Sequence, residues 1–176
     1  MKDAEIIETL SVKLGKPVGR HLYGVLGSYA ALHRFARKLP EAKDPDGRPF
    51  PEPLNANRGI LDMIPDGEFR RLAENEARRP EPTAAHVGKA FEVFLRSHLQ
   101  TSGFVVLSNL EMLFAYGVDL DILRTLATDD HRLLLLLPGR RSGEKVVLFP
   151  GDDSMSYSLP TNLIAANHLW ELAESE

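Results

Sequence analysis

The stretch "GVLGSYAAL" (residues 24–32) follows the apolar pair Leu22–Tyr23 and leads into the helix-like segment "ALHRFARKL". A strand, a glycine-containing turn and a helix in this order often bind a nucleotide phosphate, because backbone N–H groups at a helix N-terminus attract anions. The phosphate-binding pattern is G-x-x-x-x-G-K-S/T, in which the lysine neutralises the phosphates and the hydroxyl binds Mg²⁺. Counted from Gly24, the second glycine falls on Tyr29, the lysine on Ala30 and the hydroxyl on Ala31. The stretch keeps the strand-to-helix spacing without these three groups; the alternative is that it holds only an ordinary turn.

The second informative stretch is "FVVLSNLEMLF" (residues 104–114), which begins as a strand buried on both faces. In a nucleoside triphosphatase an aspartate ends such a strand and helps to hold Mg²⁺, and a nearby glutamate often orients the attacking water. Here the aspartate position is Ser108, which carries no charge, and Glu111 follows three residues later. Glu111 alone is more often a helix N-terminal charge than a catalytic base.

Working outward, strands alternate with helical segments. Apolar runs predict strands at 20–24, 103–108, 131–139 and 144–150, the third of them stopped by Pro138–Gly139. Helical spacing predicts helices over 3–14, from Ser28 to about 39, over 83–100 and over 161–172, with short helices after 108 and a brief strand and helix within 54–64. Residues 40–53 and 66–82 are predicted to be surface loops, and residues 1–19 an N-terminal helical segment. This order indicates a single α/β domain over 1–176, with a three-layer arrangement and a largely parallel central sheet.

Composition excludes several classes of protein. The chain has 176 residues, of which 43% are hydrophobic. Because it contains no cysteine, disulfides and cysteine chemistry are absent. Its net charge of −4 disfavours a surface that binds duplex DNA or RNA, without excluding one. No segment reaches the roughly 18 apolar residues of a membrane span, and the N-terminus lacks a signal-peptide core. We therefore expect a cytoplasmic protein with no membrane partner.

Other candidate sites are weak. The six histidines do not show the i, i+4 spacing of a helix-borne zinc site, and no serine lies in a G-x-S-x-G turn. Asp119 and Asp121 are typical of a helix cap, and the acidic segment 150–156 is more typical of a polar turn than of a cation site. Trp170 is expected to pack the last helix on the sheet. The sequence predicts no catalytic residue, no metal site and no cofactor.

The segment from Gly103 to Gly139 resembles the second half of BrxF, a family of small P-loop proteins from bacteriophage-exclusion (BREX) defence systems. The residues that carry the resemblance are Leu107–Glu111, Leu113–Phe114, Leu120–Asp121 and Leu133–Gly139. The segment from Leu22 to Leu39 falls where that family has its phosphate loop and first helix, and the resemblance covers about residues 20–140. It implies a P-loop NTPase-like fold in which the loop lysine corresponds to Ala30 and the strand-ending aspartate to Ser108.

These two departures indicate a fold that has lost its nucleotide chemistry. We interpret Gly24, Gly27, Ser28, Tyr29 and Ala30 as a vestigial phosphate loop, because each lost charge-assisted contact removes about 1.5–3 kcal/mol of binding. The resemblance then suggests a non-catalytic scaffold or adaptor that docks a large AAA-type ATPase or a phosphatase-like subunit, with homo-oligomers also possible. Two alternatives remain open: a nucleotide-binding or hydrolysing subunit with an atypical loop, aided by Arg140 or Arg141, and a DNA-binding accessory module.

Overall fold

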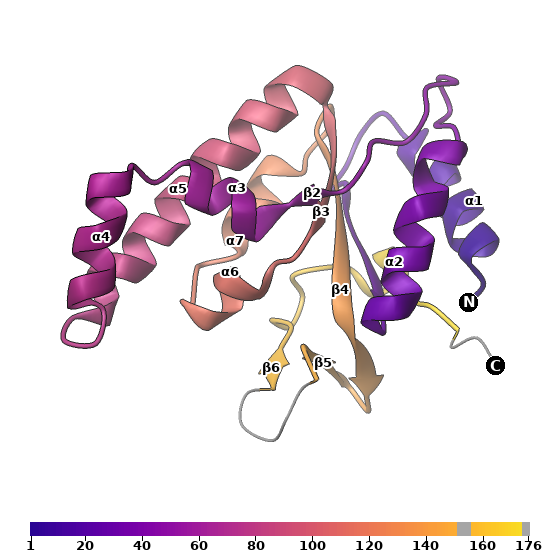
Figure 1. Cartoon of the computed structure of the whole chain (residues 1–176). Helices are drawn as coiled ribbons and strands as arrows, with labels where there is room; N and C mark the ends of the chain where they lie inside the picture. Colours follow the sequence, from indigo (N-terminus) through magenta and orange to yellow (C-terminus); the bar gives the residue numbers. More distant parts are fainter. Residues whose placement is uncertain (151–155, 174–176) are drawn as a thin grey trace.

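The three longest apolar runs of the chain form the centre of one sheet in the computed structural model, which describes residues 1–150 and 156–173 (Figure 1). Strand β4 (Arg132–Ser142) lies between β1 (Leu22–Gly27) and β3 (Phe104–Ser108) and is parallel to both. Short strands extend the sheet on each side: β2 (Leu54–Asn55) pairs with β3, and β7 (Leu169–Glu171) pairs with β1. The parallel part therefore has the order β2-β3-β4-β1-β7, which confirms the predicted α/β fold with a mostly parallel sheet.

An antiparallel extension follows where the sequence predicts the end of a strand. Strand β4 does not stop at Pro138–Gly139 but continues to Ser142, where it turns back into β5 (Lys145–Leu148), which in turn pairs with β6 (Tyr157–Ser158). Gly139 permits this close pairing, because a Cβ atom there would lie 2.4 Å from the carbonyl oxygen of Val147. The predicted stop at Pro138–Gly139 is therefore wrong, because Gly139 allows β4 to continue and to pair closely with β5.

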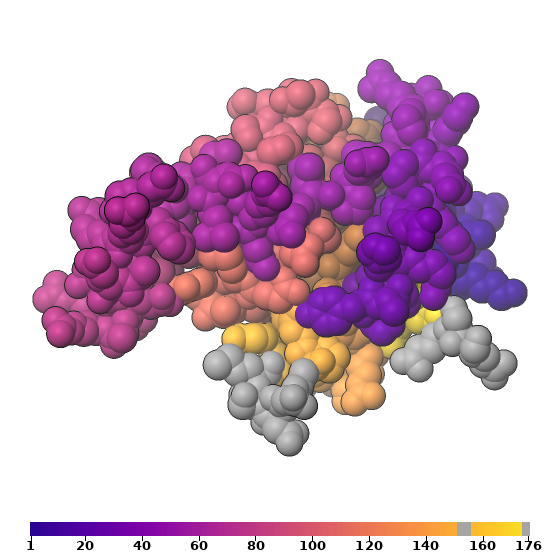
Figure 2. All heavy atoms as spheres, viewed as in Figure 1, coloured from indigo at the N-terminus to yellow at the C-terminus, as the bar shows by residue number. Residues whose placement is uncertain are grey.

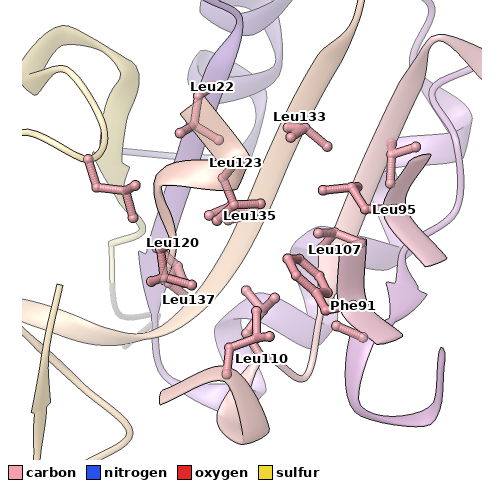
Figure 3. Packing of buried hydrophobic residues seen from close by; sticks show 14 of the residues in the cluster. Leu22, Phe91, Leu95, Leu107, Leu110, Leu120, Leu123, Leu133, Leu135 and Leu137 are labelled. Carbon is pink, nitrogen blue, oxygen red and sulfur yellow. The ribbon is translucent and has the colours of Figure 1, made fainter. Parts of the chain in front are cut away.

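Helices cover both faces of the sheet. On one face lie α1 (Asp3–Leu14) and α2 (Tyr29–Lys38), and on the other α3 (Ala56–Asp62), α5 (Pro80–Ser102), α6 (Glu111–Ala115) and α7 (Asp121–Leu126). The sheet separates two hydrophobic clusters, because successive side chains of β1 point to opposite faces. Tyr23 and Val25 pack toward α1 and α2, whereas Leu22 and Leu26 belong to the larger cluster on the other face. Figure 3 shows the larger cluster, in which Phe91 and Leu95 of α5 lie close to the leucines of the sheet.

The N-terminal prediction is confirmed. Helix α1 begins with its acidic residues, where the backbone N–H of Lys2 donates to Glu5 Oε2 at 2.9 Å, and it ends at Gly15. The segment 40–53 is a surface connection as predicted, apart from the short 3₁₀ helix η1 (Leu39–Glu41). Phe50, only 2% exposed, anchors this connection in the core.

The segment 66–82 is not the solvated loop that its charge predicts. Residues 66–75 form α4 (Asp66–Asn75), which buries Leu72 and packs against α5. In Figure 1, α4 and the N-terminal half of α5 project away from the sheet, and Figure 2 shows them as a lobe on one side of the molecule. One buried leucine and a neighbouring helix are enough to order this segment, because Glu, Arg, Leu and Ala all favour helix.

The last predicted helix, over 161–172, is wrong. This segment is irregular up to a 3₁₀ turn, η2 (Ala166–His168), and then enters strand β7, in which Trp170 pairs with Val25 of β1. Trp170 does pack on the core, but from a strand: its ring stacks on Tyr23 with the ring centroids 5.9 Å apart. Pairing with β1 prevails because it supplies hydrogen bonds to a central strand that would otherwise form an unpaired edge.

Candidate functional site

Strand β1 runs into helix α2 with almost no loop between them. Gly27 still pairs with Pro138 of β4, the backbone N–H of Leu172 donates to the carbonyl of Leu26 at 2.8 Å, and α2 begins at Tyr29. Only Ser28 separates the strand from the helix, whereas a phosphate loop needs several backbone N–H groups turned inward outside the sheet. The prediction that Gly24 opens a loop is therefore wrong: both glycines are strand residues.

Close packing explains the two glycines. A Cβ atom on Gly24 would lie 2.7 Å from Leu169 Cδ1 and 2.8 Å from Ile164 Cδ1. On Gly27 it would lie 3.2 Å from Leu172 Cδ1. Gly24 thus makes room for side chains that cover the sheet, a requirement that has no connection with phosphate.

Ser28, Tyr29 and Ala30 form the start of α2. Ser28 caps the helix as predicted, its Oγ accepting a hydrogen bond from the backbone N–H of Ala31 at 3.2 Å. Tyr29 is 53% exposed, and its hydroxyl donates to Glu111 Oε1 at 3.2 Å. Burial and the neighbouring Glu111 carboxylate raise the pKa of Tyr29. The large side chain of Tyr29 thus replaces the second glycine of a phosphate loop, and the methyl group of Ala30 replaces its lysine.

Glu111 ties three strand-to-helix junctions together. Besides Tyr29 of α2 it binds Asn57 of α3, whose Nδ2 donates to Glu111 Oε2 at 2.9 Å. The Oδ1 of the same asparagine accepts from the backbone N–H of Met112 at 3.0 Å. Glu111 is the first residue of α6, as its predicted role at a helix N-terminus requires. Each carboxylate oxygen of Glu111 already accepts a hydrogen bond from the protein. These hydrogen bonds connect the N-terminal ends of α2, α3 and α6 at the edge of the sheet.

Ser108 lies at the end of β3, as predicted, in surroundings that require a donor. Its Oγ donates to the carbonyl oxygen of Leu54 at 3.3 Å and to Oδ1 of Asn109 at 3.1 Å. Both partners are acceptors, so an aspartate here would place a carboxylate against two other oxygens. The neighbouring Asn109 has a positive φ of 53°, which asparagine tolerates better than most residues. The hydrogen bonds at this position therefore suit serine better than an ionised acid.

A pocket lies beside this network, between α2 and the carboxyl ends of β3 and β4. Its volume is about 400 Å³. The residues that line it are Tyr29, Leu32, His33, Ala36, Pro53, Ser108, Asn109, Leu136 and Pro138. Because helices leave β1 and β3 toward opposite faces of the sheet, the pocket lies close to a switch in chain direction, where α/β folds commonly bind ligands. Sequence reasoning missed it, since four segments distant in the chain contribute its walls.

Arg140 and Arg141 do not supply a cation to the start of α2. Both lie in the outer, antiparallel part of β4, and Arg141 Nη2 donates to the carbonyl oxygen of Leu169 at 2.8 Å. Arg141 is therefore committed to the backbone of β7, and Arg140 is exposed to solvent. The postulated rescue of phosphate binding by these arginines gains no support from their positions.

The remaining sequence candidates also have structural roles. Asp119 Oδ1 accepts from the N–H of Asp121 at 2.9 Å, which confirms the predicted cap. Among the described residues no three potential metal ligands come together, and no helix there is long and apolar enough to cross a membrane. In the acidic segment 150–156, residues 151–155 lie outside the described part of the chain.

Sequence reasoning also missed a buried aromatic cluster at the opposite end of β1. The Nδ1 of His21 and the hydroxyl of Tyr23 are 2.8 Å apart, while Nε2 of His21 is buried and has no hydrogen-bond partner among the described residues. Burial, reinforced by the charge of Arg132, lowers the pKa of His21. Burial raises the pKa of Tyr23 to about 12. Burial, with the charge of Lys13 next in importance, also lowers the pKa of His168, whose ring lies 4.6 Å from that of Tyr23.

Exposed apolar side chains occur on α3, α4 and α5 and on the connection between α3 and α4. Four large apolar residues there are each at least 41% exposed: Leu61, Met63, Phe69 and Val93. A hollow of about 200 Å³ between Met63 and Val93 is bordered by the polar residues Glu68, His86 and Lys89. We call these four side chains the α3–α5 patch. Its apolar centre and polar border are typical of a protein-docking surface.

Comparisons with protein-family models, with curated proteins and with solved structures find no match for this chain. The fold and the site are therefore interpreted from the chain's own residues, and the resemblance to BrxF remains a hypothesis.

Proposed function

We propose that this protein is a non-catalytic scaffold or adaptor that acts through protein–protein contacts. The α3–α5 patch carries the proposal, because it exposes four large apolar side chains on α3, α4, α5 and the connection between α3 and α4. Met63 and Val93 border the same hollow, and exposed apolar groups that lie together gain free energy when a partner removes them from water. The remaining large exposed apolar residues among the described ones, such as Val12 and Val18, lie elsewhere on the chain.

The carboxyl edge of the sheet supports the non-catalytic part of the proposal. A single residue joins β1 to α2, and Glu111 is held by two donors from the protein itself. The hydroxyl of Ser108 donates to two acceptors, and serine lacks the negative charge that would help to hold Mg²⁺. Without the loop, the lysine and the acid, the protein lacks several charge-assisted contacts to a nucleotide and its Mg²⁺, each worth about 1.5–3 kcal/mol.

The resemblance to BrxF supplies the biological setting that we propose: a bacterial, cytoplasmic anti-phage system of the BREX type. Within it, the large AAA-type ATPase and the phosphatase-like subunit are the candidate partners. A net charge of −4 does not favour the alternative role in DNA binding.

Calorimetry with Mg-ATP and Mg-GTP, at concentrations up to millimolar, tests the loss of nucleotide binding. We expect no heat of binding. Saturable binding with a micromolar dissociation constant would contradict the proposal and would favour a nucleotide-binding subunit with an atypical loop. Retention of DNA that is lost with rising salt would instead favour the DNA-binding alternative.

Co-expression with each candidate subunit tests the docking role. Phe69→Glu places a charge in the α3–α5 patch and should abolish co-purification of the true partner. Val12→Glu is the matched control, because Val12 is 68% exposed on α1, across the sheet from the patch. Equal loss with both variants, or no loss with Phe69→Glu, would refute the assignment of this surface.

A further inference from the structure

The pocket between α2 and the sheet has room for one bulky side chain. Tyr29, Leu32, His33 and Ala36 lie on the same side of α2 at helical spacing and form one wall. Leu136 and Pro138 of β4 provide further apolar wall. Its volume of about 400 Å³ is near the lower end of ligand-binding pockets, which span about 300–1,000 Å³.

Helix α2, which forms this wall, carries more positive than negative charge. The helix contains Arg34, Arg37 and Lys38 and no acidic residue. Arg34 and Lys38 share a single carboxylate, that of Asp3, whose Oδ2 lies 3.3 Å from Arg34 Nε and 2.7 Å from Lys38 Nζ. Arg34 and Lys38 are thus paired with α1, and Arg37 is the cation of α2 that has no carboxylate partner within the described residues.

Arg37 is the cation best placed to meet a partner at the pocket. It follows His33 by one helical turn, so the two side chains leave the same side of α2. Arg37 is exposed, and within the described residues its side chain has no ion pair or hydrogen bond. A carboxylate arriving here would therefore gain a contact without having to displace an existing one.

We propose that this pocket docks an acidic segment of a partner protein, with one apolar anchor side chain in the pocket and a flanking carboxylate on Arg37. This inference rests on the proposed adaptor function, for which it specifies the chemistry of a partner. Tyr and Arg are enriched at the centres of protein interfaces, and an apolar anchor seated in such a pocket commonly dominates the binding energy. A nucleic acid fits less well, because the walls are mostly apolar and the chain as a whole is acidic.

Two polar side chains of the pocket are suited to hold the backbone of the docked segment. The Nδ2 group of Asn109 donates to no acceptor within the described residues, although the Oδ1 of the same side chain accepts from Ser108. His33 lies on the opposite wall, on α2, and is exposed. An extended segment crossing the pocket would bring its carbonyl oxygens within reach of such donors.

A nuclear magnetic resonance titration of the ¹⁵N-labelled full chain tests the proposal with a defined probe, the blocked peptide Glu-Glu-Trp-Glu-Glu. We expect saturable shifts of the backbone amides at 29–37 and 108–109. The matched peptides Lys-Lys-Trp-Lys-Lys and Glu-Glu-Ala-Glu-Glu should bind at least about tenfold more weakly, because each lacks one half of the recognition.

Two variants locate the contact on the protein. Arg37→Glu should weaken the acidic peptide at least about tenfold, while Arg70→Glu, an exposed arginine on α4, should leave its affinity unchanged. Ala36→Leu narrows the pocket and should weaken the tryptophan peptide without changing the charge of α2. Arg37→Glu decides the matter if Ala36→Leu does not fold.

Several outcomes would overturn the docking proposal. These are equal binding of the lysine-flanked peptide, shifts confined to other regions, no shift at millimolar peptide, or salt-sensitive shifts of the same amides with a single-stranded oligothymidine. The last result would assign the pocket to nucleic acid. None of them requires Mg-ATP to bind, so failure of this proposal can be told apart from failure of the non-catalytic assignment, which a heat of nucleotide binding would reveal.

Discussion

Replacing Gly24 by alanine separates the two explanations of this residue. If Gly24 is a strand residue that makes room for Leu169 and Ile164, the new Cβ would start 2.7 Å and 2.8 Å from their Cδ1 atoms. Ordinary carbon–carbon contacts are about 3.5–4.0 Å, so both methyl groups must move by roughly 1 Å. Over-packing of this kind typically costs about 1–3 kcal/mol, and we expect the lower half of that range because both atoms end side chains that can rotate.

The sign of the change in unfolding free energy distinguishes a glycine in a loop from a glycine packed in a strand. A glycine in an open loop at negative φ would gain about 0.4–1 kcal/mol of stability on change to alanine, because the unfolded chain loses freedom. The same gain offsets part of the clash in β1, which leaves a net loss of about 1 kcal/mol in the free energy of unfolding. Urea unfolding measures it directly, with Trp170 as the fluorescent reporter, since it is the single tryptophan and pairs with β1.

A second substitution tests the mechanism. Ile164→Val removes one clashing methyl group and alone should cost about 0.5–1.5 kcal/mol. In the Gly24→Ala background it should cost about 0.5–1 kcal/mol less, because it relieves the crowding. Gly67→Ala in α4 is the control: no atom lies within 4 Å of its would-be Cβ, and it should be stabilising by up to about 1 kcal/mol. A Gly24→Ala variant as stable as the parent, or strictly additive double-variant energies, would refute the packing argument.

Three further predictions use other parts of the structure. Gly139→Ala should cost about 3 kcal/mol by the same unfolding assay, more than Gly24→Ala, because the obstructing atom is the backbone oxygen of Val147 and cannot rotate away; a smaller cost than at Gly24 would argue against the tight hairpin. Asn57→Asp turns the donor that faces Glu111 into a second carboxylate, and should lower the free energy of unfolding by about 2 kcal/mol at pH 7 but by much less near pH 4; equal losses at both pH values would contradict this. Burial lowers the folded-state pKa of His21 below its unfolded value of 6.5, so its share of stability is complete above that value and is lost as pH falls; His21→Gln should flatten the decline in stability between pH 7 and pH 5, and an unchanged slope would show that His21 does not cause it.

Much of the fold could be predicted because the decisive patterns are local. Continuous apolar runs identify β1, β3 and β4, and helical spacing identifies α1, α2 and α5, since each run needs only its own residues to show which surface it buries. Ser28 was recognisable as a cap for the same reason, because a cap bonds within the next three residues.

The errors arise where distant partners decide the structure. Leu163, Ile164 and Trp170 have spacing compatible with a helix, but β1 offers an unpaired edge that no local pattern reveals. The charged segment 66–75 becomes α4 through contact with α5, a helix whose direction the sequence does not give.

The candidate site divides in the same way. The losses at Tyr29, Ala30 and Ser108 are visible from spacing alone. The pairing of Gly27 with Pro138 is not visible, because it depends on how far two parallel strands run together. The hydrogen bond between Asn57 and Glu111 joins residues from separate segments, and only the assembled sheet brings them within 2.9 Å.

The order of the strands has a consequence for how the protein is made. Strand β1 leaves the ribosome early, yet its two neighbours, β4 and β7, both lie in the last third of the chain. Its apolar residues therefore stay without a sheet during most of synthesis, and closing such long connections slows folding. Until β4 and β7 have been synthesised, the exposed β1 segment is accessible to chaperones and to proteases. Substitutions in β4 or β7 should consequently reduce the yield of protein in cells by more than the stability of the purified chain would indicate.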